Sequence, residues 1–374
     1  MNVRVKLVVF FIAFAVGTLW ASPGTEGRFR YSLRSDLQST LDSTVPGLYT
    51  QVEAELLSVL NTLDADVETS IPADTQTNFL KSMASSGVGA SRGLGLDYAS
   101  NPDIFTVGFG LGAGTTGLTD LINGNVAENA LPSFGAAAGM SAVVGLNARR
   151  VGLKDFWKIK TNRLNLYLNV MSYSLNVDKF RFSTFSLGAH GQYKIIPQKA
   201  ILPFKMLHWG GVDVSTGFDY LSMEVLFQNK YSFTEVDTSN PPYTTKIRWD
   251  VTGRVGADTG VFTIPIEAST NLQFLYIFTL FGGLGLDLNL GSTSSIADVG
   301  GDFSYIVSNA GTVQAEVIGG NATLDLSETQ HPPIVDLRAF AGIQMNIWAL
   351  KLVLSGGWAT GDTYNINMFF RVAY

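Results

Sequence analysis

Apolar and polar residues alternate with a period of two along much of the chain. From Phe274 to Leu290, apolar side chains hold one parity, while Thr, Gly, Asp and Asn hold most of the other. The same alternation recurs in residues 105–113, 164–170, 212–220, 247–255 and 335–346. Because successive side chains of a β-strand point to opposite faces, this pattern predicts strands with one apolar and one polar face.

Turn-forming residues divide the chain after residue 102 into about 12 such segments. The apolar parity also switches at Tyr220-Leu221, and Asn309-Ala310-Gly311 could form a turn, so about 14 segments is the alternative. We predict an all-β fold: a transmembrane antiparallel β-barrel of about 12–14 strands over residues 103–374, with an N-terminal helical segment. A soluble sandwich or barrel also alternates, but its polar face should hold more Lys and Glu than is found here.

The first residues have the order of an export signal. Arg4 and Lys6 precede an apolar run from Leu7 to Trp20, and Ala21-Ser22 offers small residues for cleavage. This order predicts a signal peptide over residues 1–21 and export to the outer membrane. An uncleaved anchor is the alternative, but the apolar run is shorter than the roughly 20 residues that span a bilayer.

Residues 22–102 have a different pattern and are predicted to form a helical segment followed by a glycine-rich bridge. Apolar residues spaced three and four apart between Val45 and Leu63 predict an amphipathic helix over 46–64. Asp74 could cap a second helix over 75–86. These helices could plug the lumen, contact a periplasmic partner, or support the barrel wall from outside.

A periplasmic N-terminus would place loops 114–133, 234–244 and 319–333 on the outer side of the barrel. The final strand, TYNINMFFRVAY, carries apolar residues on one parity and ends in an aromatic residue. It resembles the C-terminal signal that the outer-membrane assembly machinery reads. We expect Phe370, Val372 and Tyr374 to form this signal.

Composition narrows the function classes. A net charge of −6 opposes non-specific nucleic-acid binding, which needs a basic surface. The absence of cysteine excludes disulfides, thiolate metal sites and acylated lipoprotein anchoring. None of His190, His208 and His331 has a serine two residues away, and no metal-ligand spacing is present, so we expect neither an enzyme nor a cofactor.

Charged residues on the polar parity of the strands are the candidates for a lumenal site. They are Arg248, Asp250, Arg254, Asp213, Asp219, Asp287, Asp336 and Arg338. They could form a charged constriction that selects solutes, or ion pairs that hold the barrel and a plug together. Aromatic residues near strand ends could form interface girdles or pack in the core. These are Trp209, Trp249, Trp348, Trp358, Tyr220 and Tyr374.

Two stretches carry a family resemblance. RGLGLDYASNP from Arg92 and WGGVDVSTGFDY from Trp209 resemble the leptospiral surface adhesin family of outer-membrane proteins. The resemblance implies a surface-exposed protein that binds extracellular-matrix components and plasminogen. The predicted architecture is also similar to that of the outer-membrane long-chain fatty-acid transporters, which hold a helical hatch inside a barrel.

Two functions follow as hypotheses. The first is a pore or transporter for small solutes, including hydrophobic ones, with a lumenal helical plug. The second is an adhesin that binds host matrix proteins or plasminogen through its outer loops. Outer-membrane lipid and the assembly machinery are expected partners in both cases, and the oligomeric state stays open.

Overall fold

The computed structural model describes eleven segments of the chain: residues 29–44, 49–50, 53–54, 73–99, 104–118, 134–155, 159–202, 206–240, 243–309, 312–325 and 329–374. The predicted leader over 1–21 and most of the predicted helix over 46–64 lie outside these residues. The predicted helix over 75–86 is confirmed as part of α4 (Ala73–Ser91).

Strands make up most of the described chain. In order, the elements are β1 Phe29–Leu33, α2 Leu37–Thr44, α4 Ala73–Ser91, β2 Phe105–Thr116, β3 Gly135–Asn147, η1 Thr161–Arg163, β4 Leu164–Val177, β5 Phe180–Ile196, β6 Lys199–Ala200, β7 Leu207–Asn240, β8 Tyr243–Phe274, β9 Phe278–Asn309, β10 Thr312–Asp325, β11 Thr329–Gln330, β12 Val335–Ile347, β13 Leu350–Ala359 and β14 Thr363–Ala373. Among the described helices, none is both long and apolar enough to cross a membrane.

The strands close into an antiparallel barrel. Its ring runs β2-β3-β4-β5-β7-β8-β9-β12-β13-β14, and β14 pairs with β2 from Thr363↔Thr116 to Ala373↔Thr106 to close it. The predicted all-β barrel is therefore confirmed, but the predicted count of 12–14 strands is wrong. Among the described residues, ten strands form the ring.

Inside the ring, the two strand faces follow the predicted alternation. Outward side chains such as Phe109 and Leu284 are 66% and 67% exposed, whereas inward Thr106 and Thr279 are 0% exposed. An apolar band that surrounds a polar interior is the surface that lipid requires. The barrel therefore spans a membrane.

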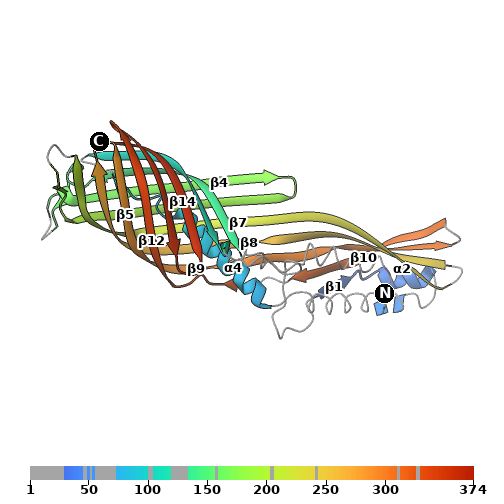
Figure 1. Ribbon diagram of the computed structural model, residues 1–374. Helices are drawn as coiled ribbons and strands as arrows, with labels where there is room; N and C mark the ends of the chain where they lie inside the picture. The colour runs from blue at the N-terminus through green and yellow to red at the C-terminus, as the bar shows by residue number, and fades with distance from the viewer. Residues whose placement is uncertain are drawn as a thin grey trace.

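Three strands continue far past the ring. β7, β8 and β9 contain 34, 32 and 32 residues, but β5 pairs with β7 only as far as Phe227 and β12 pairs with β9 only as far as Leu288. Beyond these points the sheet is open (Figure 1). We call this open sheet the projection: residues 228–240, 243–254, 298–309 and 312–325, with β1 paired to its β10 edge.

The apolar residues change parity where the strands leave the barrel. Along β8, inward Thr263 and Glu267 are buried polar residues, yet Trp249 and Val251 on the same odd parity are buried apolar residues. β7 likewise changes at Tyr220-Leu221 without turning, and Leu221 is 2% exposed. The predicted turn at that position is therefore wrong.

A straight row of outward apolar residues marks the change. Tyr220, Phe262 and Leu290 are direct neighbours across β7, β8 and β9, and they are 44%, 37% and 58% exposed. Past this row the outward parity becomes polar, with residues such as Glu224 and Asp258. This is the pattern expected where a strand passes from lipid into water. It also explains the wrong count, since residues 243–274 form one strand, β8, and residues 278–309 form another, β9, where the turn-forming residues predict breaks.

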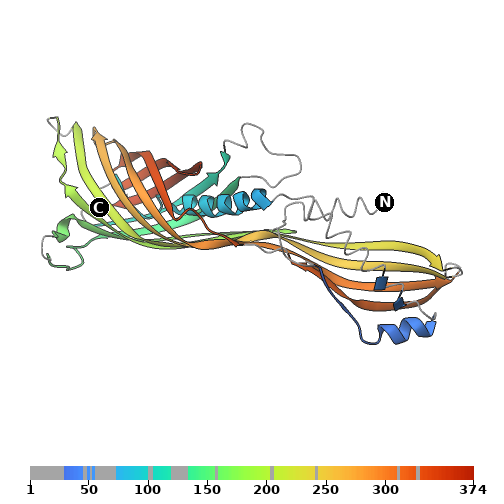
Figure 2. The same ribbon diagram turned by 90° about the horizontal axis from the view of Figure 1, so that it is seen from below.

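Residues 73–99, which we call the interior segment, lie against the inner wall of the barrel (Figure 2). α4 is rich in small residues near its end, and Leu80, Ala84 and Ala90 are 0% exposed. The wall is flat where the helix lies on it: a Cβ added to Gly114 would come within 2.4 Å of the Ser86 carbonyl oxygen. The glycines of β2 therefore leave room for a helix inside a narrow barrel.

The described residues of the predicted outer loops lie on the side of the barrel opposite the C-terminus. Much of the sequence assigned to them is strand, because β7, β8 and β10 extend through 234–240, 243–244 and 319–325. At the other end, a described residue of the long connection between β3 and β4 is held by hydrogen bonds. Asp155 Oδ1 there accepts hydrogen bonds from the backbone N–H (2.9 Å) and hydroxyl (2.8 Å) of Thr161.

Candidate functional site

The barrel interior holds a cluster of buried charges. We define the interior ion-pair cluster as Arg92, Asp97, Asp219, Glu267, Asp287, Arg338 and Arg371. Each member is at most 4% exposed. Arg92 and Asp97 come from the interior segment, and the other five come from inward positions of the strands.

Arg92 lies at the centre of the cluster. Its guanidinium pairs with Asp219 of β7, and its Nε lies 2.9 Å from Asp287 Oδ2 of β9. Asp287 is shared, because Arg338 Nε lies 3.4 Å from the same oxygen. Arg338 also pairs with Glu267 of β8. These five side chains join the interior segment to four strands of the wall, β7, β8, β9 and β12.

A second set of contacts holds the end of the interior segment. Arg371 Nη1 lies 3.4 Å from Asp97 Oδ1. The Tyr98 hydroxyl donates to Glu267 Oε2 at 2.8 Å, and its ring centroid lies 4.6 Å from that of Phe340. Residues 92–99 are therefore fixed by charge, hydrogen bonding and aromatic packing together.

Asparagine side chains of the wall hydrogen-bond the backbone of the interior segment. Asn365 Nδ2 donates to the Gly89 carbonyl at 3.1 Å, Asn367 Nδ2 to that of Arg92 at 2.9 Å, and Asn271 Nδ2 to that of Tyr98 at 2.8 Å. A helix leaves its final carbonyls without intrahelical partners, so such donors are required where a helix ends away from water. The wall is thus matched to this segment.

Opposite charges alternate within the cluster. It contains three arginines and four carboxylates, and His190 Nε2 lies 3.0 Å from Asp219 Oδ1. Buried charges are tolerated when they are paired and hydrogen-bonded. Ion-selective constrictions instead use rings of like charge. The geometry corresponds to the ion-pair interpretation of the lumenal charges.

The structure separates the predicted site residues into two groups. Five lie at buried inward positions: Asp213, Asp219, Asp287, Asp336 and Arg338. Lys194 Nζ lies 2.9 Å from Asp213 Oδ2, and the Thr360 hydroxyl donates to Asp336 Oδ1 at 2.5 Å.

The other three predicted lumen residues do not face the lumen. Arg248, Asp250 and Arg254 lie on the projection, where side-chain exposure is 38%, 55% and 49%. The parity change explains the error, because the polar parity of β8 faces outward beyond the barrel and inward within it. Arg248 Nε lies 3.3 Å from Asp250 Oδ2, and Arg254 Nη2 lies 2.9 Å from Asp298 Oδ2.

Five residues that hold the interior together are not among the predicted site residues: Arg92, Asp97, Tyr98, Glu267 and Arg371. A signal was present for several of them. The first three belong to the RGLGLDYASNP stretch, and Asp219 belongs to the WGGVDVSTGFDY stretch. The two stretches that carry the family resemblance therefore meet through the Arg92–Asp219 ion pair.

Of the six predicted girdle residues, four are exposed, Trp209 is half-buried and Trp249 is buried. Trp348, Trp358, Tyr220 and Tyr374 are 98%, 46%, 44% and 68% exposed. Trp249 is only 9% exposed and lies on the inner face of the projection, so it is not a girdle residue.

The three predicted assembly-signal residues lie together at the end of the chain. Phe370 and Val372 are 39% and 42% exposed on the outward face of β14, and Tyr374 follows that strand. The Phe370 ring stacks on that of Phe109, with centroids 5.6 Å apart. Recognition of these residues by the assembly machinery stays a prediction.

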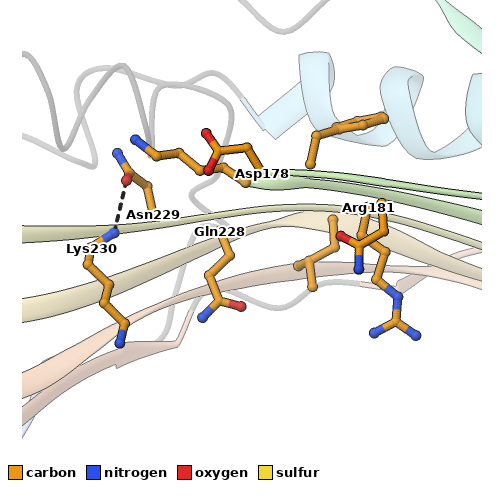
Figure 3. Close-up of a pocket in the computed structure, with 9 residues that line it drawn as sticks. Asp178, Arg181, Gln228, Asn229 and Lys230 are labelled. Carbon is orange, nitrogen blue, oxygen red and sulfur yellow. Dashed lines mark hydrogen bonds between the residues drawn. The ribbon is translucent and has the colours of Figure 1, made fainter.

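A hollow of about 540 Å³ lies where the β4–β5 turn meets β7, near the base of the projection (Figure 3). Its rim carries three cationic side chains, Lys179, Arg181 and Lys230, against one carboxylate, Asp178. Arg181 Nη2 lies 3.8 Å from Glu224 Oε2, a long contact between partly exposed groups. The hollow is therefore electropositive and open to water.

Solved structures resemble this chain only weakly. The CymD monoaromatic hydrocarbon channel matches with 8% identity over 78% of this chain and 98% of its own, at a TM-score of 0.25. The translocator domain of the autotransporter NalP from Neisseria meningitidis has 8% identity, coverage of 74% and 89%, and a TM-score of 0.26. The Pseudomonas putida toluene transporter TodX has 8% identity, coverage of 78% and 98%, and a TM-score of 0.23. Similarity at this level does not bear on function.

No curated protein matches the sequence. A family model does: the one described as Lsa36-like matches residues 38–374. That range includes the interior segment, every strand of the barrel and strands β7 to β10 of the projection, but not β1. It agrees with the resemblance carried by the two stretches that meet inside the barrel. The chain belongs to the Lsa36-like family.

Proposed function

We propose that this protein is a closed outer-membrane barrel that holds an adhesive sheet, the projection, above the membrane. One observation carries the proposal: β7, β8 and β9 run unbroken through the row Tyr220–Phe262–Leu290 into an open sheet with a polar outward face. At a rise of about 3.3 Å per residue, residues 221–240 of β7 can span about 65 Å. The family resemblance supports binding to host matrix proteins.

The interior supports a closed barrel. The interior segment occupies the lumen side of the wall, and its buried charges, Arg92 and Asp97, are paired with those of the wall instead of lining a free passage. In this proposal the interior segment is a plug. The pore or transporter hypothesis then needs the plug to move, and the pairs that Arg92 and Asp97 form with the wall oppose that movement.

The hollow at the base of the projection supplies a contact of defined chemistry. Lys179, Arg181 and Lys230 favour acidic groups, such as carboxylate or sulfate groups on matrix components. The amide side chains of Asn176, Gln228 and Asn229 also line the hollow and can donate hydrogen bonds to an anion.

A truncation in register tests the adhesive role. Asn229, Gly253, Val299 and Leu324 are neighbours across the four strands. Replacing residues 230–252 and 300–323 with Asn-Gly turns shortens both hairpins at one level. Binding to immobilised matrix proteins should be lost, while heat-dependent gel mobility should show a folded barrel. Unchanged binding by the folded truncation would refute the proposal.

Conductance in planar bilayers tests the closed barrel. The intact protein should give no steady conductance, and deletion of residues 73–91 should open a channel. The paired variant Lys179→Ala/Lys230→Ala, which leaves the interior untouched, should keep the barrel closed while weakening binding. Steady conductance by the intact protein would instead favour the pore hypothesis.

A further inference from the structure

The two ends of the described chain lie at opposite ends of the barrel. β2 begins where the chain ends, since the backbone N–H of Ile104 donates to the Tyr374 carbonyl at 2.7 Å. β1, by contrast, pairs with β10 of the projection, from Phe29↔Leu324 to Leu33↔Gly320. The part of the chain between β1 and β2 must therefore pass from one side of the membrane to the other.

The interior segment supplies that passage. Its residues contact the wall in order from the projection end to the C-terminal end. A Cβ on Gly135, at the start of β3, would come within 2.3 Å of the Ser82 carbonyl oxygen, and one on Gly112 within 2.7 Å of that of Ala90. Asp97 then reaches Arg371 and Thr106, near the opposite end. The chain runs down the lumen from α4 to β2.

The position of β1 lies well beyond the membrane. Gly320 and Leu324 of β10 are level with Phe303 and Val299 of β9. Val299 comes nine residues after Leu290 of the row Tyr220–Phe262–Leu290, which corresponds to about 30 Å of strand. α2 follows β1 and also contacts β10 (Figure 2). Residues 29–44 are thus part of the projection.

We infer that the N-terminal part of the mature chain crosses the membrane through the lumen of its own barrel and is displayed on the far side as the edge of the projection. The interior segment is what remains in the lumen once the crossing is complete. Its length matches this role, because the 19 residues of α4 span about 28 Å at 1.5 Å per residue, about the thickness of a bilayer core. This inference goes beyond the proposed adhesive function, which needs only the strands of the projection.

Single-cysteine labelling tests the crossing directly, because the chain contains no cysteine. The variants are Ser35→Cys beside β1, Ser232→Cys on the projection and Lys154→Cys in the connection between β3 and β4, all at exposed positions. Intact cells are treated with a membrane-impermeant biotin maleimide, and the labelling is repeated after permeabilisation. Ser35→Cys and Ser232→Cys should be labelled in intact cells, and Lys154→Cys only after permeabilisation.

The outcomes separate this inference from the proposed function. If Ser35→Cys were labelled only under the conditions that label Lys154→Cys, both positions would lie on the same side of the membrane, and the crossing would be overturned. If Lys154→Cys alone were labelled in intact cells, the barrel would have the opposite orientation in the membrane, and the proposed adhesive surface would be overturned. Ser35→Cys and Ser232→Cys would then be protected together, which would still support the crossing.

A crosslink tests the path inside the barrel. A Cβ on Gly89 would lie 3.0 Å from Cγ2 of Thr363, a separation that a disulfide can bridge. Gly89→Cys/Thr363→Cys should therefore form a disulfide on mild oxidation and shift on a non-reducing gel. The matched pair Gly89→Cys/Ile366→Cys should not, because Ile366 faces outward and is 58% exposed. Equal crosslinking of both pairs, or of neither, would overturn the lumenal path.

Discussion

The barrel and the projection are built from the same strands but bury opposite kinds of residue. In the barrel half of β8, Ile266 is 47% exposed and Glu267 is 4% exposed. In the projection half of the same strand, Trp249 is buried and the Asp250 side chain is 55% exposed. The inner face stays on the odd parity throughout, and only the surrounding solvent changes. The position where the apolar residues change parity therefore marks where the strand passes from lipid into water.

The ion pairs of the two regions also differ in their exposure to water. The Arg92–Asp219 pair joins groups with side-chain exposures of 3% and 4%, whereas those of the Arg254–Asp298 pair are 49% and 31% exposed. Removing one partner of a buried pair leaves a charge without water or a counter-ion. The same change at a surface pair leaves a charge that water solvates. Removing one partner should therefore lower the free energy of unfolding more at the buried pair than at the exposed pair.

The largest effect is expected for Arg92→Met. It leaves Asp219 and Asp287 without their shared cation, so we expect a loss of about 3–5 kcal/mol in the free energy of unfolding. Urea titration of the protein in lipid vesicles, followed by tryptophan fluorescence, measures it. A loss below about 1 kcal/mol, the range of surface pairs, would mean that the cluster does not hold the interior together.

Arginine placed on the outward face tests the lipid boundary. Ile266→Arg puts a charge into the apolar band and should cost about 2–4 kcal/mol. Thr252→Arg has the same parity on the same strand but lies on the projection, so its cost should fall within about 0.5 kcal/mol of zero. The same vesicle titration compares them. Equal costs would contradict a boundary between the two positions.

The sequence predicted much of the barrel but not its extent. Period-two alternation identified the strands and placed Asp219, Asp287 and Arg338 on the inner face, because polarity in a membrane barrel follows the face. This alternation did not predict where the strands leave the membrane. The apolar residues change parity there, and a change of parity resembles a turn when lipid and water are not distinguished.

The partners in the interior were beyond sequence analysis for a different reason. Arg92 and Asp219 are 127 residues apart, and no local pattern links them. Their pairing depends on how the interior segment lies against the wall. Only the family resemblance marked both stretches, and it did so without indicating contact between them.

An added methyl group tests the fit of α4. Gly114→Ala forces a Cβ against the Ser86 carbonyl and should cost about 1–3 kcal/mol. Gly260→Ala is the matched control, because nothing lies within 4 Å of its Cβ position. Deleting residues 73–91 should remove the difference between the two variants. A difference that persists in the deletion would show that the helix is not what Gly114 accommodates.

The smallest effect is expected on the projection. Arg254→Gln breaks the exposed pair with Asp298 and should change stability by only about 0–1 kcal/mol, and less at high salt. Comparison of urea midpoints at low and high salt measures both the change in stability and its dependence on salt. A cost as large as that of Arg92→Met would erase the distinction between the two regions.

Fluorescence quenching along β8 measures whether one strand lies in lipid on one side of the row Tyr220–Phe262–Leu290 and in water on the other. A bimane label is placed on single cysteines at the outward positions Ile266, Phe262, Asp258, Arg254 and Asp250, in vesicles that contain a lipid-bound quencher. Quenching should be strong at positions 266 and 262 and should be lost from position 258 onward. Quenching that stays strong through 254 and 250, or is absent at 266, would contradict a boundary between lipid and water at this row.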